Sequence, residues 1–139
     1  MFRTYVRHDF EECCAHCQLH ELWRGGDDSF EIDHFRPKDD KLFPERRRDF
    51  YNLYWSCKRC NKRKENQWPS DIMIARGIGF VDLCQDTFDM HYVVKSDGQL
   101  ESLTPSGDYT IKSLRLNSDH LSELRVSLIK EGKPFDRRP

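Results

Sequence analysis

Two C-x-x-C pairs constrain this chain more than any other feature of its sequence. Cys14 and Cys17 form the first pair, and Cys57 and Cys60 form the second. Four thiolates from two such pairs match the tetrahedral ligand set of a closed, structural zinc site. A long stretch of chain lies between the pairs, so the site would carry an insertion between its two knuckles. We therefore predict a structural Zn²⁺ ion in the N-terminal half of the chain.

The six cysteines have other possible uses. Disulfides are typical of secreted proteins, but the N-terminus lacks the apolar stretch of a secretory signal, which indicates a cytoplasmic protein. At the first knuckle, Cys13 or His16 is an alternative ligand. Cys84 is expected to be a buried, unpaired thiol, with a joint role with His91 as the alternative.

The composition is that of a polar domain, whose fold a bound metal ion would help to stabilise. Of the 139 residues, 34% are charged, and no apolar run approaches the length of about 18 residues that suggests a membrane span. A modest core of this kind is stabilised by metal binding. The net charge of -1 shows no general attraction to nucleic acid, but basic residues gather in two clusters. These clusters are Arg46 to Arg48, and Lys58, Arg59, Lys62, Arg63 and Lys64. Either cluster would contact phosphate or simply be solvated.

The sequence of the N-terminal half predicts a strand, a charged loop, an aromatic stretch and a basic helix, in that order. Residues 29–35 alternate between apolar and polar side chains, which predicts a short strand. An aromatic stretch precedes the second cysteine pair, and a basic helix is expected to follow it to about Glu65. The Trp68-Pro69 segment breaks the pattern. We place one module at residues 1–70 and a C-terminal extension that packs on it at residues 71–139.

The C-terminal half is expected to contain a hairpin and two helices. Asp97-Gly98 lies between apolar runs, which is typical of a hairpin turn, and residues 79–83 and 92–95 look extended. The helices are expected at residues 110–116 and from the N-cap residue Ser118 onward. The second helix carries an apolar stripe that predicts a core face: Leu121, Leu124, Leu128 and Ile129.

Between and around the cysteine pairs lies a set of polar residues in a recognisable order. Asp33-His34 is followed by Asn52-Leu53, and the second cysteine pair is followed at once by Asn61. Over residues 14–64 this pattern resembles the HNH endonuclease family. Residues 80–125 show a looser similarity to the tail of small stand-alone bacterial HNH proteins.

The resemblance implies a fold and a mechanism. The fold would be α+β, with a ββα-metal (HNH, His-Me finger) nuclease core, a structural zinc site and a small C-terminal hairpin and helical extension. Asp33 and Asn61 would hold a catalytic Mg²⁺ or Mn²⁺, His34 would be the general base, and Asn52 would orient that base and tighten the loop. Asn61 stands where the family name has a histidine, which leaves the preferred metal open.

Elementary chemistry agrees with these roles. Imidazole titrates near neutral pH and can take a proton from water. Carboxylate and amide oxygens suit hard divalent cations. Taken singly, however, an Asp-His pair is usually a surface pair. Glu31, two residues before Asp33, is expected to be a surface residue of the strand, with an indirect role at the metal as the alternative.

The sequence thus predicts a metal-dependent endonuclease that acts on nucleic acid, with DNA favoured and no membrane association. The resemblance also allows a role in bacterial restriction or antiviral defence. The rival hypothesis is a zinc-knuckle module that binds nucleic acid or a partner without cutting it. The C-terminal half is a candidate surface for a protein partner or a second copy of the chain. The expected phosphate contacts are Lys64, Lys62, Arg63, Arg36 and Lys38.

Overall fold

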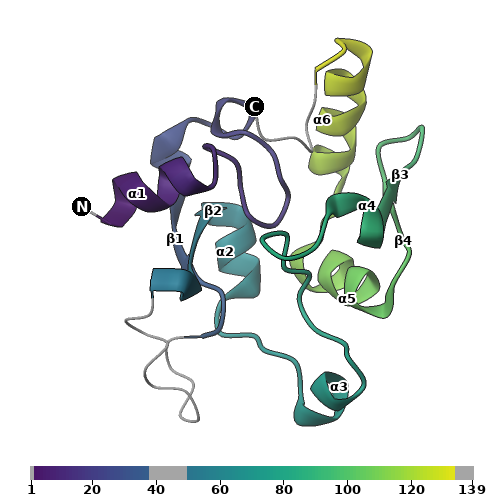
Figure 1. The fold of residues 1–139 in the computed structure, drawn as a ribbon. Helices are drawn as coiled ribbons and strands as arrows, with labels where there is room; N and C mark the ends of the chain where they lie inside the picture. The colour runs from purple at the N-terminus through teal and green to yellow at the C-terminus, as the bar shows by residue number, and fades with distance from the viewer. Residues whose placement is uncertain (1, 38–49, 134–139) are drawn as a thin grey trace. The chain divides into compact units, whose positions relative to one another are not determined.

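The computed structural model describes residues 2–37 and 50–133 (Figure 1). The chain divides into two compact units, Met1–Trp68 and Pro69–Arg137, called here the N-terminal and C-terminal units. Among the described helices, none has the length and apolar character needed to span a bilayer. The expected contacts at Lys38 and at Arg46 to Arg48 lie outside the described residues.

A hairpin followed by a helix forms the centre of the N-terminal unit. Strand β1 (Phe30–His34) pairs antiparallel with β2 (Leu53–Cys57), and helix α2 (Lys58–Lys64) follows β2 directly. The register places Phe30 opposite Cys57 and His34 opposite Leu53. Aromatic residues favour strands, and Trp55 is fully buried with its ring stacked on that of Phe30 at 5.7 Å. The α+β fold with a ββα unit, as expected from the sequence, is confirmed.

The first cysteine knuckle is attached to this unit by backbone hydrogen bonds. The Ala15 amide donates to the Trp55 carbonyl at 2.8 Å, which fixes the knuckle against β2. Helix α1 (Phe2–Asp9) precedes it and buries Val6. Phe10, just after α1, packs its ring 5.1 Å from that of Tyr54. The knuckle is therefore held between α1 and the second strand.

The C-terminal unit contains a second hairpin and four helices among the described residues. The helices are α3 (Asp71–Ala75), α4 (Phe88–His91), α5 (Pro105–Leu114) and α6 (Asp119–Lys130). Strands β3 (Tyr92–Val94) and β4 (Leu100–Ser102) pair antiparallel around the expected turn. At that turn Gly98 has a φ of +83°, and an added Cβ would lie 2.0 Å from the Ser122 carbonyl oxygen. Only glycine fits both conditions.

Several expectations for this unit are confirmed and others are wrong. Ser118 caps α6 as predicted, because its side chain accepts the Leu121 amide. Ile129 is half-exposed rather than buried, whereas Arg125 of the same helix is buried and donates to two backbone carbonyls. Residues 79–83 form no strand, and the helix expected at 110–116 runs from Pro105 to Leu114. Cys84 is exposed.

Candidate active site and metal centre

The four cysteines of the two pairs come together in the N-terminal unit. The sulfur atoms of Cys14, Cys17, Cys57 and Cys60 all lie within 4.8 Å of one another, and all four residues are buried. A tetrahedral Zn²⁺ with Zn–S distances of about 2.3 Å fits that spacing. The donor set therefore suits a structural zinc ion with no open position.

The local backbone presents these thiols to one another. The Cys60 amide donates to the Cys57 sulfur at 3.4 Å, so Cys57 also caps α2, and the His16 amide donates to the Cys14 sulfur at 3.4 Å. Arg24 donates to the Cys57 sulfur at 3.5 Å. Each contact favours a thiolate, the form that binds metal. The pKa of Cys17 lies well above its ordinary value because its thiol hydrogen-bonds the neighbouring sulfurs, Cys14 first, and metal binding must displace that proton.

The other predicted ligands of the first knuckle have different partners. Cys13 is buried, but its side chain is not part of the sulfur cluster, and its backbone forms an isolated antiparallel β-bridge with that of His20. The His16 side chain contacts Asp33 of strand β1, as described below. In the C-terminal unit His91 contacts Asp86 at 2.8 Å and Thr104 at 2.6 Å.

A pocket of about 600 Å³ lies beside β1 and α2. It brings together three of the four residues that the sequence assigned to catalysis: Asp33, His34 and Asn61. The fourth, Asn52, is buried and does not line it. The other described lining residues are Glu31, Ile32, Pro37, Lys58, Lys62, Glu65 and Asn66.

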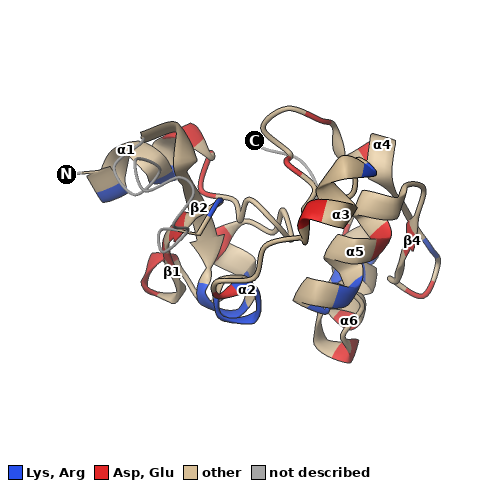
Figure 2. Cartoon of the chain, turned by 90° about the horizontal axis from the view of Figure 1, so that it is seen from below, with Lys and Arg blue, Asp and Glu red and all other residues tan. Residues whose placement is uncertain are grey.

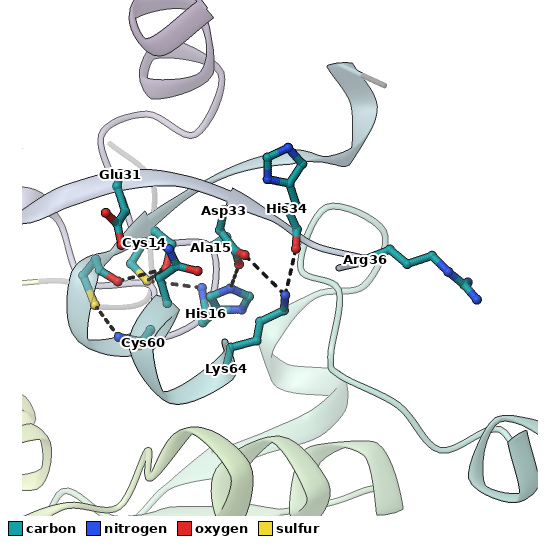
Figure 3. Close-up of polar contacts among 12 residues, drawn as sticks. Cys14, Ala15, His16, Glu31, Asp33, His34, Arg36, Cys60 and Lys64 are labelled. Atoms are coloured by element: carbon teal, nitrogen blue, oxygen red, sulfur yellow. Dashed lines mark hydrogen bonds and ion pairs between the residues drawn. The ribbon is translucent and has the colours of Figure 1, made fainter. Parts of the chain in front are cut away.

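Asp33 and His34 leave the strand in opposite directions (Figure 3). The Asp33 carboxylate points to the buried side, where its Oδ2 lies 2.7 Å from His16 Nε2 and its Oδ1 lies 3.3 Å from Lys64 Nζ. Lys64 also donates to the His34 carbonyl at 2.9 Å. Adjacent residues of a strand face opposite sides, so the His34 ring is directed away from this network.

The network around Asp33 is almost fully buried. The side-chain exposures are 1% for His16, 3% for Asp33 and 0% for Lys64. Burial disfavours the charged imidazole, but the hydrogen bond to Asp33 and the negative charges of Asp33 and Cys14 together outweigh it and raise the pKa of His16. Burial lowers the pKa of Lys64, an effect that Asp33 offsets in part. The carboxylate thus compensates two buried groups.

The burial of Lys64 contradicts the expectation that this residue contacts phosphate. Its ammonium group is fully buried and ion-paired, so it presents no charge to a substrate. The sequence shows a run of basic residues, but it does not show which of them turns inward. A spacing of three residues from Asn61 would have placed Lys64 on the same face of α2.

Glu31 is a site residue that the sequence reading assigned to the surface. It stands two residues before Asp33 on the same face of β1, is partly exposed, and lines the pocket. Asn61 Nδ2 donates to Glu31 Oε1 at 2.8 Å. The strand alternation was the signal that could have paired Glu31 with Asp33.

Asn52 holds the segment that follows β1. Its Oδ1 accepts the Arg36 amide at 2.8 Å and its Nδ2 donates to the Arg36 carbonyl at 2.9 Å, while the Asn52 carbonyl accepts the Phe35 amide at 3.0 Å. These bonds tighten the chain directly after His34. The further expectation that Asn52 orients the His34 ring stays a prediction.

The remaining basic residues of the site gather on α2, which Figure 2 shows as a blue segment. Lys58 and Lys62 are exposed and line the pocket, and Arg63 is partly exposed. Arg36 places its guanidinium 5.0 Å from the centre of the Trp68 ring. Lys58 was not among the expected phosphate contacts, although it belongs to the same basic cluster.

Comparison with known proteins agrees with this geometry. Residues 14–67 match the family model described as HNH endonuclease. That range contains both cysteine pairs, β1, β2 and α2. No curated protein matches the chain significantly.

Proposed function

Because residues 14–67 form a domain of the HNH endonuclease family, we propose that the chain is a metal-dependent endonuclease that hydrolyses phosphodiester bonds in nucleic acid, with DNA favoured. The observation that carries the proposal is the pocket beside β1. There an imidazole, a carboxylate and an amide lie with two lysines around one cavity. These groups are the ones that proton transfer, cation binding and phosphate binding require.

His34 is the general base. His34 lines the pocket with its ring directed away from the buried ion pair, and an imidazole at this position can take a proton from an attacking water. The strand position of His34 is rigid, because Lys64 holds its carbonyl and Asn52 holds the residues after it. A base on a fixed strand keeps the same distance to the bound phosphate in every turnover.

The pocket also suits a hard divalent cation. Its oxygen donors are carboxylates and the Asn61 amide, which are ligands that Mg²⁺ and Mn²⁺ accept. When bound, such a cation supplies charge neutralisation for the phosphate and the leaving oxygen. Asn61 is the helix residue that holds it. Asp33, the partner implied by the resemblance, has its carboxylate committed to two buried cationic partners.

Basic residues around the pocket bind the nucleic-acid backbone. Lys58 and Lys62 line the cavity, and Arg63 lies on the same helix. Arg36 is the fourth candidate, on the segment after β1. Contacts of this kind give affinity without sequence information, so we expect low sequence specificity.

The zinc ion has a separate, structural role. Its four ligands are thiolates in a closed set, and they join the first knuckle to the β2–α2 junction. A structural ion of this kind stabilises the fold and takes no part in bond cleavage.

A plasmid-nicking assay tests the proposal. The wild-type chain should nick supercoiled DNA with Mg²⁺ or Mn²⁺, and His34→Ala should lower the rate by about 100-fold or more because the general base is lost. His8→Ala is the matched control, since His8 is exposed on α1 and is not among the residues that line the pocket. A single-stranded RNA substrate, assayed in parallel, tests the preference for DNA. If His34→Ala cleaves as fast as wild type, the nuclease proposal fails.

The alternative is a module that binds nucleic acid without cutting it. The zinc knuckles and the lysines of α2 would serve both functions, but the imidazole beside the carboxylates has no use in binding alone. Binding without metal-dependent cleavage would favour this alternative. A role in defence would need an activating partner or a second copy, which co-purification with the full chain would reveal.

A further inference from the structure

Three aromatic side chains of the N-terminal unit are largely exposed. Tyr51 is 88% exposed, Tyr5 60% and Phe2 58%. Phe2 and Tyr5 lie three residues apart on α1, so their side chains project from the same side of that helix. Single exposed apolar side chains are ordinary, but a contiguous group of them marks an interaction site.

Ring contacts join these side chains into one patch. The rings of Phe2 and Phe50 lie 6.2 Å apart, and those of Phe50 and Tyr51 also lie 6.2 Å apart, edge to face. Phe50 and Tyr51 belong to the one-turn helix η4 (Phe50–Asn52), which leads directly into β2. Two segments far apart in the chain thus contribute to a single patch, called here the aromatic surface: Phe2, Tyr5, Phe50 and Tyr51.

The α1 end of the aromatic surface adjoins the face of the hairpin that carries His34. Ile32 and His34 share one face of β1, because side chains alternate along a strand. Trp55 lies directly opposite Ile32 in the pairing of β1 with β2, so its side chain is on that face too. Arg3 on α1 places its guanidinium 4.8 Å from the centre of the Trp55 ring. Helix α1 therefore packs over the face from which the His34 ring projects (Figure 3).

The η4 end of the aromatic surface lies beside the end of β1. His34 is paired with Leu53, the first residue of β2, and Tyr51 precedes Leu53 by two residues. Asn52 stands between them and is fixed by two hydrogen bonds to the Arg36 backbone. A nucleic-acid strand with a phosphate at His34 would therefore pass Tyr51 with its neighbouring nucleotides.

The charges of the two segments suit a nucleic-acid strand. Helix α1 has no acidic residue before Asp9, and residues 50–64 contain none. Arg3 and Arg7 are paired with acidic side chains, so the aromatic surface is itself weakly charged. Positive charge for the strand backbone comes from the exposed lysines of α2 at the pocket. Aromatic rings beside a basic groove are the combination with which proteins bind single-stranded nucleic acid.

We propose that the aromatic surface stacks unpaired bases of the substrate next to the scissile phosphate, so that the enzyme acts on single-stranded DNA and on unpaired segments of duplex DNA. This substrate preference rests on the proposed nuclease function. A base presents its face to an aromatic ring only when it is outside a duplex stack, and every base has such a face, so binding is tolerant of sequence. Supercoiled plasmid remains a substrate, because negative supercoiling favours local unpairing.

The test measures binding of a fluorescently labelled single-stranded DNA to the zinc-loaded full chain by fluorescence anisotropy. No Mg²⁺ or Mn²⁺ is added, so that binding is observed without cleavage. Tyr51→Leu keeps an apolar side chain but removes the aromatic ring, and it should weaken binding by about tenfold. Tyr51→Phe keeps the ring and should bind as the wild type does. Leu22→Ala is the matched control, since Leu22 is 72% exposed in the same unit and lies outside the aromatic surface.

A duplex of the same sequence separates stacking from a general loss of binding. The wild-type chain should bind the blunt duplex more weakly than the single strand, because paired bases cannot stack on the protein. Tyr51→Leu should leave duplex binding unchanged, since the lysine contacts to the backbone remain. Because the Tyr51 side chain is exposed, both substitutions should keep the fold, and zinc content and melting temperature check this.

Base stacking is overturned if Tyr51→Leu binds the single strand as tightly as the wild type, or if Tyr51→Phe binds it as weakly as Tyr51→Leu. Equal affinity of the wild type for duplex and single strand overturns it too. So does a wild-type dimer in sedimentation that Tyr51→Leu dissociates, because the aromatic surface would then join two copies of the chain.

The two proposals fail in different experiments. A chain that nicks DNA with Mg²⁺ or Mn²⁺ but loses no single-strand affinity on Tyr51→Leu keeps the proposed function and overturns base stacking. A chain that loses single-strand affinity on Tyr51→Leu but cleaves no DNA keeps the aromatic surface as a binding site and overturns the nuclease function.

Discussion

In the N-terminal unit the fully buried side chains include cysteines and a lysine, whereas in the C-terminal unit they are three leucines together with Tyr92, Thr110 and Arg125. Cys14, Cys60 and Lys64 are inaccessible in the first unit, and Leu114 and Leu121 in the second. Thiolates and ammonium groups are stable in a protein interior only when a metal ion or an opposite charge compensates them. Leucines need no such partner. The first unit should therefore depend mainly on its thiolate and ion-pair contacts, and the second mainly on packing, with Arg125 as its one fully buried charge among the described residues, held by two backbone carbonyls.

The largest effect is expected from loss of zinc. Cys57→Ser, or removal of zinc by a strong chelator, should unfold the N-terminal unit, because structural zinc contributes about 10–16 kcal/mol in small domains. Circular dichroism and zinc content measure the loss. Cys84→Ser is the control, since Cys84 is exposed and outside the sulfur cluster. A chelated chain with an unchanged melting profile would contradict the dependence of the first unit on metal.

Breaking the buried ion pair should come next. Lys64→Met leaves the Asp33 carboxylate buried with His16 alone and should lower the free energy of unfolding by about 3 kcal/mol. Lys62→Met, on the exposed side of the same helix, should change it by less than about 0.5 kcal/mol. Denaturant titration of both variants makes the comparison. Equal stabilities would mean that Lys64 contributes nothing through Asp33.

A somewhat smaller loss is expected from a cavity in the C-terminal unit. Leu121→Ala removes a fully buried side chain and should cost about 2–3 kcal/mol, with zinc content unchanged. Ile129→Ala, at a half-exposed position of α6, should cost much less. Zinc loss on Leu121→Ala would show that the two units do not fold independently.

Much of this fold could be anticipated from local signals. The alternation of residues 29–35 predicted β1, the two cysteine pairs predicted the sulfur cluster, and Ser118 predicted the start of α6. Each signal acts through neighbours in the chain or through fixed ligand chemistry. The spacing from Asn61 placed Lys64 on the same face of α2, but neither the burial of its ammonium group nor the exposure of Ile129 had a local signal, because both depend on what lies opposite the helix.

The candidate site was likewise predicted only in part by the sequence. The order of the motif predicted that Asp33, His34 and Asn61 belong to one catalytic site, and all three line one pocket in the structure. The motif order did not predict that His16 and Lys64 would contact Asp33, nor that Asn61 would hydrogen-bond Glu31. Residues far apart in the chain make these contacts, so no local pattern contains them.

By itself the sequence determined the four cysteines that cluster, the ββα order of elements and the set of residues with useful chemistry. Spacing, alternation and ligand preference are local properties, and they act before the chain folds. Only the tertiary structure decided which carboxylate hydrogen-bonds Asn61 and which is buried against a lysine. That choice depends on the burial and the partners of each charge, and these exist only after β1, α2 and the first knuckle have packed together.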